Sequence, residues 1–114
     1  MGPDREVALD LTALRASASY SLVIERKLVL AFINVAERCI PRIAGLVVGG
    51  GHQEWRSVVQ ELEDVSVQIH ARELAAICKR ALDGSDTHVS RLGAYLEIKE
   101  AYDEFLICEV DPIV

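Results

Sequence analysis

The sequence has few residues of the kinds that build metal centres or disulfide frameworks. It contains three cysteines and three histidines, with no Cys-x-x-Cys and no His-Glu-x-x-His spacing. An odd number of widely separated cysteines is unlike a disulfide framework, and no histidine lies at zinc-ligand spacing. We therefore expect no metal ion and no cofactor, and we interpret Cys39, Cys78 and Cys108 as reduced thiols of a cytoplasmic protein.

The chain also lacks an excess of positive charge and a membrane-length apolar run. Twelve basic residues against eighteen acidic ones give a net charge of −6, which argues against nucleic-acid binding. The most apolar stretch, residues 28–36, contains Asn34 and covers about half a membrane span. The first residues include Asp4 and Glu6 and no apolar segment after a basic start. We predict neither a secretory signal nor a membrane interaction.

Apolar periodicity indicates four helices. Hydrophobic residues make up 51% of the chain, which is enough for one domain over residues 1–114. The expected helices run from a cap at Asp4 to about residue 17 or 19, from 21 to 39, from 53 to 82 with a bend near 66–72, and from a cap at Ser85 or Asp86 to about residue 106. Pro41 should end or kink the second helix, Gly49 to Gly51 should form a turn, and Asp111-Pro112 should end the last helix.

These elements predict an all-α fold, a single-domain antiparallel four-helix bundle with short connections. The second helix is apolar almost all the way round, which is typical of a central helix and leaves room for a homodimer. A homodimeric scaffold or regulatory subunit is therefore one functional alternative.

Motifs for catalysis are sparse, and we expect a protein without catalytic activity. His70 and Glu73 share a helix face, but one such pair is more often a surface pair than a site. Glu61 with Asp64, and Glu97 with Glu100, give two acidic pairs. If they faced each other across the bundle, they would suit a metal-dependent helical nucleotide hydrolase, which is the enzyme alternative.

Negative charge is concentrated at the end of the chain. Residues 95–114 hold six acidic residues and one lysine, which sum to −5. Such a helix is either a solvated face or a surface that steers a basic protein partner. On the second interpretation the acidic contacts are Glu97, Glu100, Asp103 and Glu104. Tyr95 and Tyr102 are then anchors, although helical spacing equally allows a place in the core for Tyr102.

Part of the C-terminal half resembles the small all-helical immunity proteins with which bacteria neutralise secreted interbacterial toxins. The residues that carry this resemblance are Leu74-Ala75-Ala76-Ile77 through Asp83, then Arg91-Leu92-Gly93 and Ile98-Lys99-Glu100. They cover about a third of the chain. The resemblance implies a cytoplasmic, non-catalytic protein that binds its cognate toxin and occludes the toxin's active site.

Overall fold

The structure is a computed structural model of the 114-residue chain, and it describes residues 11–19, 21–84 and 86–109. These residues contain no strand and form five helices: α1 (Leu11–Ser17), α2 (Leu22–Val48), α3 (His52–Gln68), α4 (Arg72–Asp83) and α5 (His88–Glu109). The all-α prediction is confirmed. The helix count is one higher than predicted, because the expected helix over residues 53–82 is two helices.

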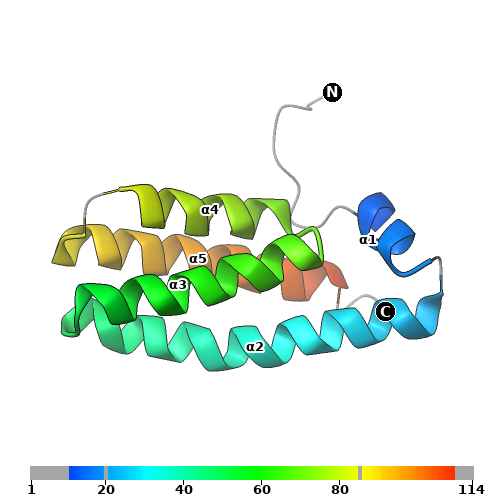
Figure 1. The fold of residues 1–114 in the computed structure, drawn as a ribbon, viewed down its shortest axis with the longest axis horizontal. Helices are drawn as coiled ribbons and strands as arrows, with labels where there is room; N and C mark the ends of the chain where they lie inside the picture. The colour runs from blue at the N-terminus through cyan, green and yellow to red at the C-terminus, as the bar shows by residue number, and fades with distance from the viewer. Residues whose placement is uncertain (1–10, 20, 85, 110–114) are drawn as a thin grey trace.

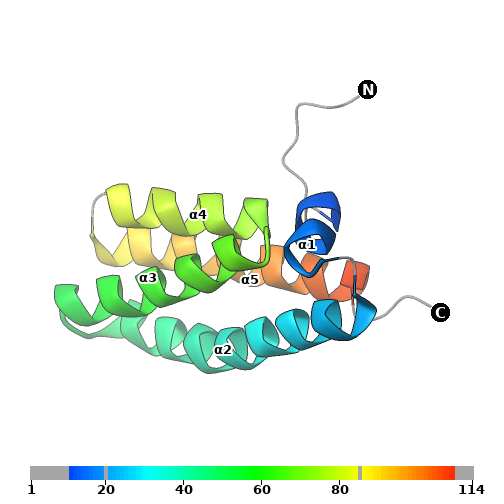
Figure 2. The ribbon, with the colours of Figure 1, turned by 45° about the vertical axis from the view of Figure 1, so that its right-hand side comes forward.

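The four longer helices lie side by side, and each runs opposite to the one before it (Figures 1 and 2). Around this arrangement α2 contacts α3 and α5, and α4 contacts the same two helices. The short α1 lies at the end where α2 begins and α5 ends. It places Leu14, which is fully buried, in the shared core.

A cluster of aromatic rings forms part of that core. Phe32 of α2 packs edge-on against Phe105 of α5, with ring centroids 4.9 Å apart, and Tyr102 lies 6.1 Å from Phe32. Such tilted pairs suit the quadrupoles of aromatic rings. The contact fixes α5 against α2, so the outward face of α5 has a defined direction.

The prediction that Pro41 ends or kinks the second helix at that point is wrong in its boundary, because α2 continues to Val48. Proline deprives the carbonyl of Glu37 of its helical hydrogen bond, but both residues lie on the exposed side of α2, where water can hydrogen-bond instead. Beyond the proline, Ile43, Leu46 and Val47 are buried. Their burial compensates for the missing bond, so the helix persists.

The predicted long helix over residues 53–82 is wrong, because α3 ends at Gln68 and α4 starts at Arg72. His70 adopts a left-handed conformation with φ of 62°. The amide of Ala71 donates to the Ser66 carbonyl and that of His70 to the Val67 carbonyl, which is the Schellman pattern of a helix C-terminus. Glycine usually occupies the left-handed position, and its absence hid the break in the sequence.

Hydroxyl groups cap the starts of α2 and α5, and neither was among the expected caps. The hydroxyl of Ser21 accepts a hydrogen bond from the amide of Ile24 and caps α2. Thr87 rather than Asp86 caps α5, because its hydroxyl accepts from the amide of Ser90 at 3.0 Å. The expected cap at Asp4, the alternative cap at Ser85 and the stop at residues 111–112 lie outside the described residues.

Among the described residues, no helix combines the length and apolar character needed to cross a membrane.

Candidate functional site: an acidic groove between α4 and α5

An open groove of about 470 Å³ runs between α4 and α5. Its sides carry four carboxylates and one guanidinium, and its floor is apolar. The lining residues are Glu73, Ala76, Ile77 and Arg80 of α4, and Glu97, Glu100, Ala101 and Glu104 of α5. Formal charge in the groove is therefore strongly negative.

Helical spacing explains why the α5 carboxylates gather here. Glu97, Glu100 and Glu104 are three and four residues apart, which places them along one side of a helix. All three are exposed. The guanidinium of Arg80 lies 3.7 Å from Glu97, and both side chains are more than half exposed, so this ion pair is weak. The groove keeps a negative potential that Arg80 offsets only in part.

Asp103, the fourth predicted contact, does not join the groove. Its carboxylate accepts hydrogen bonds from the ammonium of Lys99 at 3.0 and 3.1 Å, one turn earlier on α5. This pair lies outside the groove lining. The structure thus brings together three of the four predicted acidic residues and adds Glu73 from α4, which the sequence interpretation did not include.

Tyr102 occupies the core rather than the surface. Its side chain is 4% exposed, and its hydroxyl donates to Glu37 of α2 at 2.8 Å. Burial and this hydrogen bond raise the pKa of the Tyr102 phenol. Tyr102 is therefore no surface anchor in this fold, and the core alternative holds. Tyr95 is half-buried against the core.

The two acidic pairs of the enzyme alternative do not face one another. Glu61 and Asp64 lie on α3, whereas Glu97 and Glu100 lie on α5, and these two helices are not neighbours. Glu61 is paired with Arg38 of α2. Within the described part of the chain, no group of three or more His, Cys, Asp or Glu side chains is arranged to hold a metal ion.

The two described thiols lie in the core. Cys39 of α2 and Cys78 of α4 are both fully buried and unpaired in any disulfide. Burial raises the pKa of Cys39 to about 11 and raises that of Cys78 as well. A thiol that resists ionisation is a poor nucleophile, so neither is suited to covalent catalysis.

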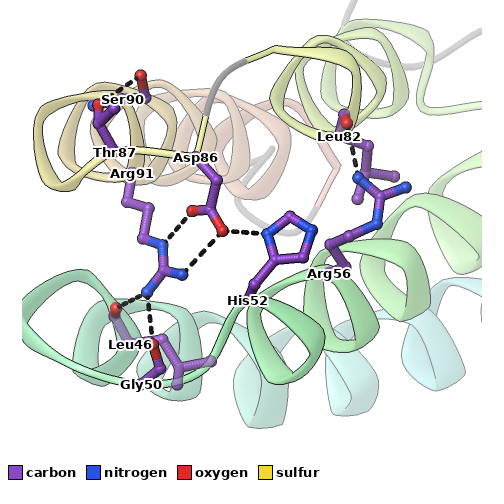
Figure 3. A network of polar contacts seen from close by, with 9 residues as sticks. All are labelled: Leu46, Gly50, His52, Arg56, Leu82, Asp86, Thr87, Ser90 and Arg91. Carbon is purple, nitrogen blue, oxygen red and sulfur yellow. Dashed lines mark hydrogen bonds and ion pairs between the residues drawn. The ribbon is translucent and has the colours of Figure 1, made fainter.

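Arg91 is a buried charged residue to which the sequence interpretation gave no role in the fold or in the site. It is 8% exposed, and its guanidinium donates to the carbonyls of Leu46 at 2.8 Å and Gly50 at 3.2 Å (Figure 3). It also donates to both carboxylate oxygens of Asp86 and lies 5.2 Å from the centre of the Trp55 ring. One side chain thus fastens the start of α5 to the end of α2 and the turn before α3.

Asp86 links this cluster to α3, because it also accepts a hydrogen bond from Nδ1 of His52 (Figure 3). Hydrogen bonds from Arg91, and then from His52, hold the pKa of the Asp86 carboxyl well below its usual range. The signal in the sequence was periodicity, since Arg91 lies seven and fourteen residues before the buried Ile98 and Phe105. A charged residue at a position whose helical spacing predicts burial is expected to have specific hydrogen-bonding groups around it.

Comparisons of the chain with protein-family models, with curated proteins and with solved structures find no match.

Proposed function

We propose that this protein is a non-catalytic protein-binding module, and that the acidic groove between α4 and α5 receives a basic surface of its partner. The observation that carries the proposal is the convergence of Glu73, Glu97, Glu100 and Glu104 on one groove with an apolar floor. Unlike-charged surfaces attract at long range and raise the rate of association. If the acidic residues of α5 form only a solvated helix face, no specific partner is expected.

The resemblance to immunity proteins makes this proposal more specific. On that basis the partner is a toxin, the protein acts in the cytoplasm, and binding occludes the toxin's active site. An antiparallel four-helix bundle, with α1 added at one end, suits this role because its surface is formed before the partner arrives.

The test is capture of a partner from the organism that encodes the chain, followed by reconstitution of the purified pair. A groove variant carries Glu97→Gln, Glu100→Gln and Glu104→Gln. A matched control carries Glu54→Gln, Glu63→Gln and Asp64→Asn on α3, so the net charge changes equally in both proteins. Association rates are then measured at several salt concentrations.

We expect one stoichiometric partner that binds the control normally and binds the groove variant at least tenfold more slowly, with a flatter salt dependence. Equal loss in both variants would show that only net charge matters and would overturn the groove assignment. If the partner is an enzyme that stays active in the complex, the occluding role is wrong, although the binding role remains.

A further inference from the structure

The acidic groove continues into a second hollow along the same two helices. This hollow has a volume of about 360 Å³ and shares Ile77, Arg80 and Glu97 with the first. Its other lining residues are Trp55, Ala81, Gly84, Ser90, Gly93 and Ala94. The two hollows therefore form one channel that follows α4 from Glu73 to Gly84.

The two halves of this channel differ in chemistry. The first half carries Glu73, Glu100 and Glu104, whereas the second is lined mainly by small side chains. Two large apolar side chains on the same part of α5 are exposed outside the lining of the hollow: Val89 is 77% exposed and Leu96 is 56% exposed. Helical spacing places both within one turn of Gly93. The channel thus has an acidic half and an apolar half lined mainly by alanine and glycine, with Arg80 and Glu97 where the two halves meet.

The dimensions and floor of the channel suit an α-helix. Its α5 side runs from Ser90 to Glu104, about 21 Å at 1.5 Å per residue, which matches a helix of about 14 residues. Glycine and alanine let a further helix approach closely, as in helix pairs 8–10 Å apart. Nothing lies within 4 Å of the position where a Cβ on Gly93 would stand, so the space above it is open.

We infer that the occupant of this channel is an amphipathic helix of the partner protein, with basic residues in one half and apolar residues in the other. This inference rests on the proposed function and specifies the partner segment. The basic half lies over Glu73, Glu100 and Glu104, and the apolar half lies over Gly93 and Ala94. Helix-in-groove binding of this kind gains affinity from the apolar contact and specificity from the charges.

Selection from a displayed library of random 16-residue peptides tests the inference. The full chain is the bait, and enriched peptides are measured by fluorescence anisotropy against three variants. Gly93→Leu fills the apolar half. Glu100→Gln with Glu104→Gln neutralises the acidic half. Gly45→Leu is the matched control, because Gly45 is an exposed glycine in α2 with equally open space around it.

Enriched peptides should become helical on binding and carry lysine or arginine in one half only. We expect Gly93→Leu to weaken them at least tenfold without changing the salt dependence, and the paired Gln variant to weaken them and flatten that dependence. Gly45→Leu should bind normally. Failure to enrich any peptide, or unchanged binding by Gly93→Leu, would overturn the inference.

Two further outcomes separate this inference from the proposed function. If the captured partner depends on the α5 carboxylates but binds Gly93→Leu normally, the protein-binding role stands and the helical occupant is wrong. Sedimentation of the chain alone covers the possibility of a homodimer. A dimer that Gly93→Leu dissociates would make a second copy the occupant and would overturn the assignment to a partner.

Discussion

Arg91 and Asp86 show how one partly buried ion pair organises a junction of three helices. The guanidinium donates to the carbonyls of Leu46 in α2 and Gly50 in the turn before α3, and Asp86 accepts from both Arg91 and His52. A buried charge is tolerated when each of its hydrogen-bonding groups has a partner. This junction also positions Ser90 and Gly93 beside α4, so it supports the apolar half of the channel.

Replacement of Asp86 by asparagine should make the free energy of unfolding depend less on pH in the acidic range. The pKa of this carboxyl is lower in the folded protein than in the unfolded chain, so its ionised form stabilises the fold above the usual aspartate range near pH 4. That stabilisation is lost as the pH falls from about 4 toward the lower folded-state pKa. Urea denaturation should therefore show an advantage of the wild type over D86N above about pH 5 that shrinks toward about pH 2.

Asp83→Asn is the control for this measurement, because it changes the charge equally at an exposed residue near the start of the same loop. Its effect on the free energy of unfolding should be smaller than that of D86N above about pH 5, because surface substitutions usually change stability by less than about 0.5 kcal/mol. A D86N difference that stays constant down to about pH 2 would contradict a lowered pKa of Asp86.

Helix α2 continues through Pro41 although proline disfavours a helical conformation at that point. Proline inside a helix is about 3 kcal/mol less favourable than alanine. Pro41 is exposed and is not one of the buried residues of the core. Substitution by alanine should restore the hydrogen bond to the Glu37 carbonyl and raise the free energy of unfolding by about 1–3 kcal/mol. The urea midpoint, measured by circular dichroism, checks this.

A lower midpoint for Pro41→Ala would show that the proline bends α2 in a way that the packing of Leu46 and Val47 requires. Alanine at the exposed Gln60 of α3 provides a comparison without a proline. Its effect should be small, because surface substitutions usually change stability by less than about 0.5 kcal/mol.

Local sequence patterns predicted where helices occur better than they predicted where each helix begins and ends. The start of the second helix near residue 21 was predicted correctly, since serine at that position can satisfy a free amide by itself. The break at His70 was not readable, because it depends on a left-handed residue held by hydrogen bonds to α3 and by the buried neighbours Ile69 and Ala71. Continuation past Pro41 likewise depends on burial against other helices, which no local pattern specifies.

Only the residues that α5 contributes to the candidate site could be predicted from the sequence. Spacing along α5 places Glu97, Glu100 and Glu104 on one side without any knowledge of the fold. Glu73 and Arg80 join them only because the break at residues 69–71 turns α4 back alongside α5. The burial of Tyr102 also depends on the neighbouring helix, since its ring packs near Phe32 of α2 and its hydroxyl donates to Glu37 of α2.

One core joins the described helices, so the molecule should unfold as a unit. Buried residues from α1 to α5 form a single cluster, and it includes Cys39 on α2 and Cys78 on α4. Both side chains have no exposed surface, and burial raises both thiol pKa values. A thiol reagent can reach either sulfur only when the core opens.

We therefore expect the two thiols to react at one common rate set by global unfolding. The measurement uses the Cys108→Ser background, a water-soluble disulfide reagent at several urea concentrations, and mass spectrometry to assign the modified residue. Pro41→Ala should slow both reactions by the same factor if it stabilises the fold as a whole, since a cooperative domain has one opening transition. A faster reaction at Cys39 alone would show that α2 opens locally. In that case the scaffold that holds α4 and α5 in register would be divided into independently unfolding parts.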